Sequence, residues 1–323
     1  MSCVAFESDA AVPGPLSSGT RPGQRYEMYR ARKVAVVVPA FNEQAHIEAT
    51  LRGIPPFVDA VYVVDDGSTD GTAEIVQATI AARGAMASPI SSPYAVREPE
   101  PTLSYSAHTS YASGEAGSRG RPSIILIQHE RNQGVGAAIM TGYRRSLFDG
   151  ADVTAVMAGD NQMEPEWMPA LLDPVVDGLA DYAKGTRQTR VAHLRGMSPW
   201  RILGNLVLRV LTTIASGNPH ITDPQHGYTA ISREALKGLE LDSVYPYYGY
   251  SNDLVARLSV LRRRIVEVPM PSMYHGEVSK IQYRQYIPRV FGLLLRLFLL
   301  RITGRLGNPS RSASTSIREG LRI

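Results

Sequence analysis

The sequence predicts an α/β protein built on a doubly wound, mostly parallel β-sheet. The first observation is a continuous β-branched run at 34–38, and similar apolar runs follow at 61–64 and 123–127. Strands without polar alternation are typical of sheets that are covered on both faces. The second observation is that a segment with helical character follows each run. Strand–helix alternation at this spacing favours parallel strands joined by crossover helices.

The remaining elements follow from the same kinds of pattern. We expect the first helix to begin at a cap on Asn42 and to end near Arg52, because an Asn side chain accepts the first backbone N–H groups of a helix. Pro165 suits the first turn of another helix, where its missing N–H would have no partner. We expect strands at 34–38, 61–64, 123–127, 153–157, 181–187, 228–231 and 264–269, and helices ending near 52, 83 and 148, at 199–216, after 247, and at 286–305.

The 323 residues, 44% of them hydrophobic, suit one large domain with flanking segments. Residues 1–30 are rich in Pro, Gly, Ser and Arg and predict a mobile leader, followed by the main domain at 31–280. Within this domain, 84–122 is crowded with Pro, Ser, Gly and Tyr and predicts a flexible insertion, either a lid or a surface excursion. A single cysteine excludes an internal disulfide framework.

Positive charge gathers in the segment 281–323 and just before it. From Lys280 onward the chain carries nine Lys and Arg against one acid, so this part carries about +8 and the rest of the chain about −4, which gives the net charge of +4. A leucine-rich helix at 286–305 lies in the same segment and is too short and too charged to span a bilayer. It predicts either an interfacial helix with arginines at lipid headgroups or a helix packed between the core and a partner subunit. No motif for nucleic-acid binding is visible.

The stretch 156–165 carries the strongest local signal for a binding site. It begins as a buried strand, turns at Gly159, and then presents the side-chain oxygens of Asp160 and Gln162. A carboxylate and an amide oxygen at the carboxyl end of a strand favour a site for Mg²⁺ or Mn²⁺ shared with a ligand's phosphates. The alternative is an Asp that only caps the next helix.

Two glycines, Gly134 and Gly136, open the helix that ends near Phe148. Glycines at this place let backbone N–H groups approach an anion, or let the helix pack closely on the sheet. The Gly-x-Gly-x-x-Gly fingerprint of dinucleotide-binding proteins is absent.

With these motifs in order, the chain resembles family 2 nucleotide-sugar glycosyltransferases of the GT-A fold, and most of all their dolichol-phosphate mannosyltransferase-like branch. The resemblance covers roughly residues 33–280 and implies a Rossmann-like sheet flanked by helices. The matching segments are 38–43, 64–72, 132–136, 159–165, 184–187, 223–228 and 277–280.

The resemblance also implies roles for single residues. It implies that Asp160 and Gln162 hold the divalent ion at the donor diphosphate. It also implies that Arg187 and Arg201 bind anionic groups of the donor or acceptor, because a guanidinium pairs well with phosphate oxygens. Asp253 stands where many family members with hydroxyl acceptors carry a catalytic carboxylate. The implied nucleotide-binding residues are Pro39, Ala40, Phe41, Glu43, Asp66, Gly134 and Asp160.

Two positions depart from the family pattern. The metal motif usually reads Asp-x-Asp, and here Ala158 replaces the first Asp. The lipid-phosphate branch also usually carries an Arg shortly before its Gly-x-Ser-Lys-like motif, where this chain has 274–277, Tyr-His-Gly-Glu.

From the resemblance we expect an inverting, metal-assisted sugar transfer from a UDP- or GDP-linked sugar to a polyprenyl phosphate. The expected location is cytoplasmic, peripheral at the inner face of the membrane, with no nucleic-acid partner. One alternative is transfer to a hydroxyl of a glycan or small metabolite. The other is a degenerate, non-catalytic homologue that binds nucleotide.

Overall fold

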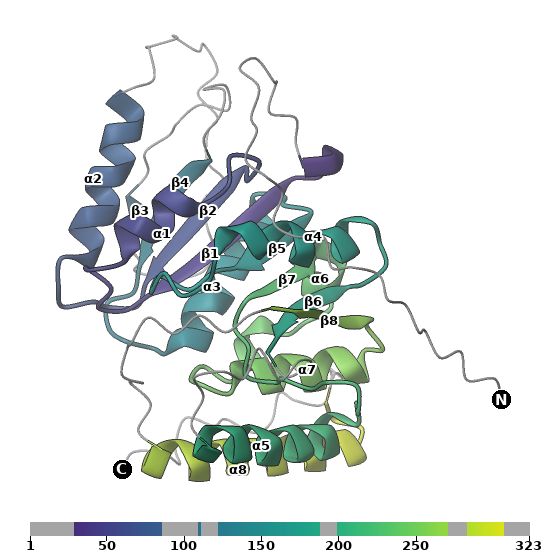
Figure 1. Cartoon of the computed structure of the whole chain (residues 1–323). Helices are drawn as coiled ribbons and strands as arrows, with labels where there is room; N and C mark the ends of the chain where they lie inside the picture. The colour runs from purple at the N-terminus through teal and green to yellow at the C-terminus, as the bar shows by residue number, and fades with distance from the viewer. Residues whose placement is uncertain (1–28, 86–108, 111–121, 188–198, 271–282, 307–323) are drawn as a thin grey trace.

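The computed structural model describes residues 29–85, 109–110, 122–187, 199–270 and 283–306. One eight-stranded mixed sheet, in the order β3-β4-β2-β1-β5-β7-β6-β8, forms the centre of the molecule (Figure 1). The strands are β1 (Val34–Ala40), β2 (Ala60–Asp65), β3 (Thr109–Ser110), β4 (Ser123–Gln128), β5 (Val153–Val156), β6 (Tyr182–Thr186), β7 (Thr229–Ser232) and β8 (Ile265–Pro269).

Two strands run against the others, β3 at the edge beside β4 and β7 inside the sheet. Strands β4, β2, β1 and β5 are parallel neighbours, whereas β7 runs antiparallel to both β5 and β6. Strand β8 is parallel to β6. The carboxyl ends of β1, β2, β4, β5 and β6 therefore lie at the same edge as the start of β7.

Helices cover both faces of the sheet, which confirms the predicted doubly wound α/β fold. The α-helices are α1 (Ile47–Gly53), α2 (Thr72–Ala85), α3 (Val135–Phe148), α4 (Met168–Val176), α5 (Pro199–Ser216), α6 (Arg233–Lys237), α7 (Tyr250–Val260) and α8 (Tyr283–Ile302), with short 3₁₀ helices at Tyr29–Ala31, Pro165–Trp167 and Leu241–Ser243. Helices α1, α2 and α4 pack on one face, and α3, α6 and α7 pack on the other.

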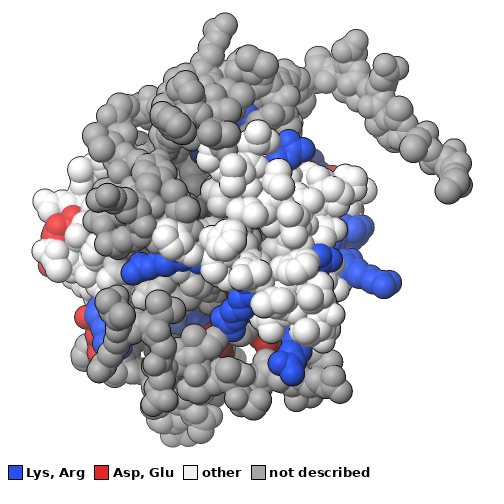
Figure 2. Space-filling model, turned by 90° about the horizontal axis from the view of Figure 1, so that it is seen from below, with Lys and Arg blue, Asp and Glu red and all other residues white. Residues whose placement is uncertain are grey.

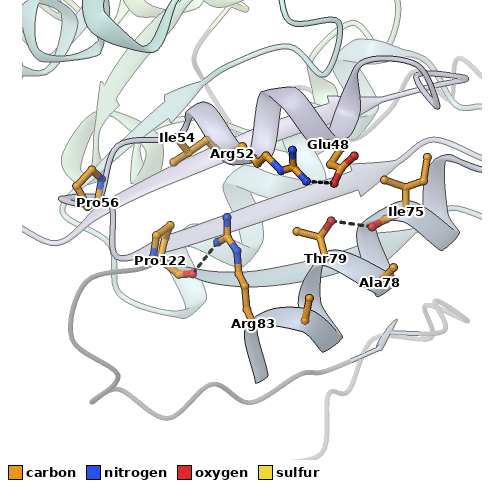
Figure 3. Close-up of a pocket in the computed structure, with 10 residues that line it drawn as sticks. Glu48, Arg52, Ile54, Pro56, Ile75, Ala78, Thr79, Arg83 and Pro122 are labelled. Atoms are coloured by element: carbon orange, nitrogen blue, oxygen red, sulfur yellow. Dashed lines mark hydrogen bonds and ion pairs between the residues drawn. The ribbon is translucent and has the colours of Figure 1, made fainter. Parts of the chain in front are cut away.

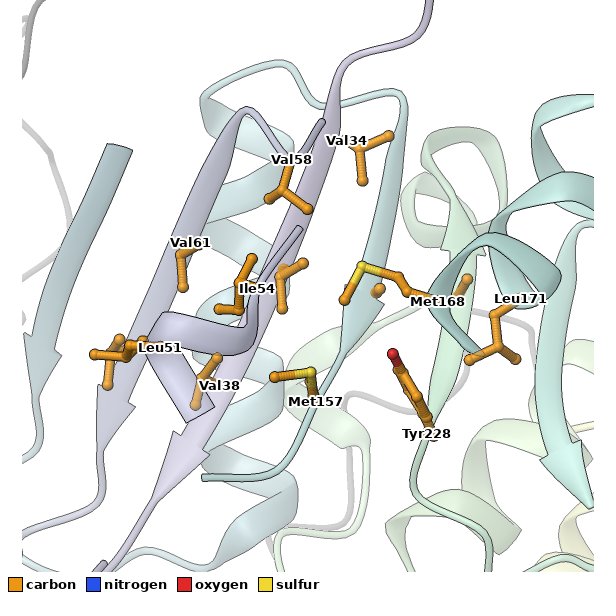
Figure 4. Close-up of a cluster of buried hydrophobic side chains, with 14 of the residues drawn as sticks. Val34, Val38, Leu51, Ile54, Val58, Val61, Met157, Met168, Leu171 and Tyr228 are labelled. Carbon is orange, nitrogen blue, oxygen red and sulfur yellow. The ribbon is translucent and has the colours of Figure 1, made fainter. Parts of the chain in front are cut away.

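Alternation along β1 supplies both cores. Val34, Val36 and Val38 point into the layer with α1 and α4, where Leu51 and Met168 lie against them (Figure 4). The residues between them face α3, α6 and α7. A strand that is buried on both sides explains why the run at 34–38 has no polar alternation.

Helices α5 and α8 lie side by side beneath α7, away from the sheet (Figure 1). The inward side chains Val290, Leu293, Leu294 and Leu297 of α8 form a third buried cluster together with α5 and α7. None of the helices in the described part of the chain is long and apolar enough to cross a membrane.

The predicted helix cap at Asn42 is wrong. Helix α1 begins only at Ile47, and Asn42 adopts a left-handed backbone with a φ of 54°. Its side-chain oxygen accepts the backbone N–H of Thr69 at 2.9 Å, so it joins two loops instead of capping a helix.

The predicted flanking segments stay predictions. The leader at 1–30 and the insertion at 84–122 lie mostly outside the described residues. At the end of the leader, Arg30 forms ion pairs with Asp173 in α4 and with Asp177 just after α4. The hydroxyl of Tyr29 donates to Asp173 at 2.5 Å. Of the segment 281–323, the structure describes α8 and the residues to 306, and α8 starts a little before the predicted helix.

Candidate active site

The loops that follow β1, β2, β4 and β5 meet at one edge of the sheet. The backbone N–H of Asp66, just after β2, donates to the Ala40 carbonyl at the end of β1 at 2.8 Å. On the other side of β1, the N–H of Gly159 donates to the Pro39 carbonyl at 3.2 Å. The predicted residues Pro39, Ala40, Asp66 and Asp160 are thus brought to a common edge, where an open α/β sheet binds its ligands.

The loop after β1 is joined to the loop after β2 by a series of hydrogen bonds. Besides the bond from Thr69 to Asn42, the backbone N–H of Glu43 donates to the Thr72 hydroxyl at 2.9 Å. The ring of Phe41, at the start of this loop, is 41% exposed. Phe41 is therefore accessible beside the strand ends, and its predicted role toward a nucleoside stays a prediction.

The Asp66 carboxylate is buried and organises the neighbouring loop. It accepts the backbone N–H groups of Gln133 and Gly134 at 2.9 and 2.7 Å, and Nδ1 of His129 lies 2.7 Å away. His129 in turn contacts the Thr141 hydroxyl on α3 through Nε2 at 3.0 Å. The sequence analysis missed His129, which follows β4 and carries no local signal beyond its position at a strand end.

Gly134 and Gly136 are required by close packing against the segment 245–250. Gly134 has a φ of 102°, and a Cβ atom there would overlap the carbonyl of Pro246 and the ring of Tyr247. The backbone N–H of Ala137 donates to the same Pro246 carbonyl at 3.0 Å. The nearest contacts of these glycines are thus with the segment 245–250, whereas one of the two predicted roles placed them against the sheet. The other role, toward an anion, stays a prediction.

The loop with Asp160 follows β5. Asp160 is half-buried and accepts the backbone N–H of Gln162 at 3.1 Å, while Asn161 between them has a φ of 58°. The turn that we expected at Gly159 is thus made by Asn161. Gly159 is needed for another reason, because a Cβ atom there would lie 3.2 Å from the Pro39 carbonyl oxygen.

The side-chain oxygens of Asp160 and Gln162 are suitable ligand atoms for a Mg²⁺ or Mn²⁺ ion. Both offer hard oxygen atoms, and Mg²⁺ commonly uses one or two carboxylates and takes further ligands from phosphates and water. The described residues contain no group of three or more His, Cys, Asp or Glu side chains that could hold a metal ion. An ion at this loop would therefore depend on the phosphates of a bound nucleotide.

Across the edge, Arg187 forms a buried ion pair that the sequence analysis did not predict. Its Nε and its backbone N–H both donate to Oδ2 of Asp223, at 2.8 and 3.2 Å, and Nη2 donates to Oδ1 at 3.1 Å. Asp223 is fully buried, and Lys184 of β6 donates to its carbonyl oxygen. Burial acts to raise the pKa of Asp223, but the Arg187 guanidinium and Lys184 outweigh it and hold this pKa below its usual range.

The turn that carries Asp223 is held by Glu267 of β8 and by the packing of His226 against Gly185. Glu267 of β8 accepts the backbone N–H groups of Thr222 and Asp223 at 2.9 and 3.0 Å. His226 packs against Gly185, where a Cβ atom would overlap the imidazole ring. Burial, together with the charge of Arg187, lowers the pKa of His226 to about 3, so the ring is neutral at physiological pH.

Asp253, the predicted carboxylate for a hydroxyl acceptor, lies in the first turn of α7 and is 2% exposed. Its Oδ1 accepts from Nε of Arg257 at 2.6 Å, and its Oδ2 accepts from the backbone N–H of Tyr245 at 2.8 Å. Arg201 lies near the start of α5, where the side chains are outside the described part of the structure. The catalytic roles given to Asp253, Arg187 and Arg201 stay predictions.

A cavity of about 790 Å³ lies between α1 and α2 (Figure 3). Arg83 crosses it and donates to the carbonyls of Pro122 and Leu51 at 3.2 and 3.1 Å. Pro122 precedes β4, so the cavity extends toward the amino ends of the strands, away from the edge with Asp66 and Asp160. None of the predicted site residues lines it.

The model of glycosyl transferase family 2 matches residues 35–87 and 108–239. The chain belongs to this family. The match includes the loops after β1, β2, β4 and β5 and the turn with Asp223. It confirms the resemblance found in the sequence and the predicted enzyme class, a glycosyltransferase.

Two curated relatives match most of the chain. A UDP-N-acetylglucosamine–dolichyl-phosphate N-acetylglucosaminyltransferase of Methanococcus voltae is 25% identical over 75% of this chain and 86% of its own length. An undecaprenyl-phosphate mannosyltransferase of Micrococcus luteus is 27% identical over 74% of this chain and 82% of its own length.

Among solved structures, glucosyl-3-phosphoglycerate synthase from Mycobacterium tuberculosis, crystallised with Mn²⁺, uridine diphosphate and phosphoglyceric acid, has a TM-score of 0.55. It is 21% identical, and the match covers 90% of this chain and 86% of that chain. This likeness supports the GT-A fold assigned to the sheet and its flanking helices.

Proposed function

We propose that this protein transfers a sugar from a nucleotide sugar to a polyprenyl phosphate, with inversion at the anomeric carbon. Polyprenyl-phosphate transferases among its relatives support this acceptor class. An oxygen of the acceptor phosphate attacks the anomeric carbon, and the bond from that carbon to the diphosphate breaks. The nucleoside diphosphate leaves with the bonding electron pair.

We choose this acceptor because the Asp253 carboxylate is buried and already hydrogen-bonded. A hydroxyl acceptor loses a proton as it attacks and needs a general base within hydrogen-bonding reach. Both oxygens of Asp253 are engaged, one by Arg257 and one by the Tyr245 backbone, and the side chain is buried. A phosphate monoester is already anionic near neutral pH, because its second pKa is about 6. Such an acceptor needs no base.

The donor would lie over the loops after β1, β2 and β5. Phe41 would flank the nucleoside, and the loop held by Asp66 would lie beside the donor. Asp160 and Gln162 would hold a divalent ion against the diphosphate, and Mn²⁺ bound with UDP in the solved structure of a neighbour supports such an ion. When bound, the ion would neutralise charge on the departing diphosphate.

Arg187 would bind the anionic side of the reaction. Its backbone and side chain are held by Asp223, so the guanidinium has one position and needs no reorganisation when a phosphate arrives. Arg201, at the start of α5, would supply a second cation. The planar fork of the Arg201 guanidinium would match two phosphate oxygens at once.

The exposed faces of α5 and α8 support a peripheral position at the membrane, which we place at its cytoplasmic face. Outward apolar side chains on these helices are between 49% and 59% exposed: Leu206, Val207, Val210, Ile214, Phe291, Leu295, Leu299 and Ile302. Neither helix contains Asp or Glu, whereas both contain Arg. Figure 2 looks at this side of the molecule, where an uncharged area has Lys and Arg around it. An apolar face with a cationic rim suits an anionic lipid surface.

The test of the acceptor compares Asp253→Asn with Arg257→Met. If Asp253 serves only its ion pair, both variants lose similar stability, and each keeps most of its transfer to a prenyl phosphate per folded molecule. A hydroxyl acceptor would instead make Asp253→Asn lose roughly 10²–10⁴ in rate while Arg257→Met stays active. The assay is single-turnover transfer from UDP- and GDP-sugars, with the product identified by mass spectrometry. Arg201→Ala should lose more activity than Asp253→Asn.

The degenerate alternative rests on Ala158, which replaces an acid of the family's metal motif. A thermal shift with UDP or GDP, with and without Mn²⁺, separates the two cases. A competent site should show metal-dependent stabilisation by nucleotide, and Ala158→Asp should strengthen it. Binding of nucleotide without turnover of any sugar donor would favour the degenerate alternative.

A further inference from the structure

The segment 245–250 links the loop at Gly134 to helix α8. It is rich in aromatic residues and leads from the 3₁₀ helix Leu241–Ser243 into α7. The proposed donor site lies on one side of this segment, and the proposed lipid-facing helix lies on the other.

On the donor side the contacts are close and made by backbone. The Pro246 carbonyl accepts the N–H of Ala137 at 3.0 Å, and the ring of Tyr247 covers Gly134 so closely that a Cβ atom there would overlap it. Gly134 itself donates to Asp66 at 2.7 Å. Gly134 therefore contacts both the Tyr247 ring and the carboxylate that organises the donor loop.

On the other side the segment rests on α8. Tyr245 packs against the buried cluster that contains Val290 and Leu293 of α8. A Cβ atom on Gly249 would lie 3.1 Å from Leu293 and 3.5 Å from the Tyr245 ring. Arg289 is close enough that its charge acts on the Tyr245 hydroxyl, although burial has the larger effect and raises the pKa of Tyr245.

Two aromatic rings of this segment are open to solvent. Tyr247 is 47% and Tyr248 is 52% exposed. The ring of Tyr247 meets that of Tyr245 edge to face, with 5.9 Å between the centroids. Two exposed aromatic rings beside the proposed ligand site offer a large contact area to a ligand.

We infer that Tyr247 and Tyr248 form the seat of the first isoprene units of the acceptor, at the point where the lipid passes from α8 to the donor edge. This inference rests on the proposed polyprenyl-phosphate acceptor. Tyrosine suits such a place because its ring contacts hydrocarbon while its hydroxyl stays in water. Arg289, at the α8 end, supplies positive charge for an anionic lipid. The same charge, with the other arginines of α5 and α8, opposes a second copy of the chain docking there, since like charges would meet.

The experiment measures binding of farnesyl phosphate to the full chain by equilibrium dialysis, below the concentration at which it forms micelles. The double variant Tyr247→Ser, Tyr248→Ser should bind about tenfold more weakly or worse, because it loses two aromatic contacts with the prenyl chain. The variant Tyr247→Leu, Tyr248→Leu should bind nearly as wild type. Phe148→Ser is the matched control, since Phe148 is 72% exposed at the far end of α3. Inorganic phosphate is the second probe and should bind equally to all variants.

Equal binding of farnesyl phosphate by the serine double variant and wild type would overturn the inference. If wild type still transferred sugar to farnesyl phosphate, the proposed function would remain supported. An equal loss for inorganic phosphate would also overturn it, because the effect would not lie in the lipid chain. If wild type neither binds farnesyl phosphate nor transfers sugar to it, both proposals fail. Should the double variant not fold, the two single serine variants, each with part of the loss, give the same decision.

Discussion

Replacing Asp223 by Asn tests whether the buried ion pair with Arg187 holds the anion-binding side of the site. Asp223 is fully buried and accepts three N–H groups from Arg187, whose side chain is 21% exposed. Removing one partner of a buried pair destabilises a protein by about 3–5 kcal/mol. Because Arg187 regains some water, we expect about 3 kcal/mol, the lower end of that range. Transfer activity should fall as well, since the guanidinium loses its fixed position.

The chain contains a matched control for this change. Asp181 accepts the backbone N–H and Nε of Arg264 in the same pattern, at 2.8 and 3.2 Å, but Arg264 is 58% exposed. Exposed pairs contribute only about 0–1 kcal/mol, so Asp181→Asn should lose little. Both variants are compared by urea denaturation with fitted midpoints and slopes. Equal losses of unfolding free energy in the two variants would refute the reasoning, because burial would then have no effect.

Three further predictions concern metal, pH and membrane. Asp160→Asn should abolish Mn²⁺-dependent transfer while thermal unfolding without ligand stays unchanged, and near-normal turnover would disprove the metal role. His226 has a pKa of about 3 in the folded state and about 6.5 in the unfolded state, so the free energy of unfolding should fall as the pH drops through this window, by up to about 1.4 kcal/mol per pH unit. His226→Gln should reduce the slope of the free energy of unfolding against pH between pH 6 and 4. An unchanged slope would contradict a buried neutral ring. Phe291→Ser with Leu299→Ser should prevent flotation with anionic liposomes at low salt, whereas wild type that ignores such liposomes would contradict the membrane face.

The strands and several helix bounds could be predicted because their signals are local. The helix at 199–216 has the predicted bounds, and the run at 34–38 reads as a doubly covered strand. Asn42 could not be placed in the same way. Its partner Thr69 lies on another loop, so a residue with good capping chemistry had no nearby sign that it would serve a tertiary bond.

The pair of Asp223 with Arg187 was missed for a related reason. The sequence offered the turn at 223–228 as part of a family motif, but nothing in it says that the carboxylate points back to Arg187 across β6 and β7. Glu267, which holds the same turn from β8, stands in a strand that reads as an ordinary edge pattern. Charged side chains from three strands come into contact only in the folded sheet, and the periodicity of the sequence carries no information about contacts between distant strands.

The reversal of β7 within the sheet explains how one edge comes to hold opposite charges. In an all-parallel sheet, the residues before β7 would lie at the far edge, away from Asp66 and Asp160. Because β7 runs antiparallel to β5, with Val156 opposite Thr229, the turn with Asp223 returns to the edge where β5 ends. There it fixes Arg187, just after β6, across from the two carboxylates. A cation and a set of acids on either side of one strand suit the proposed reaction, in which a metal-bound diphosphate would leave on one side and an anionic acceptor would arrive on the other. Changes at Asp160 should therefore abolish metal-dependent turnover, whereas changes at Arg187 should act mainly on the Michaelis constant of the acceptor.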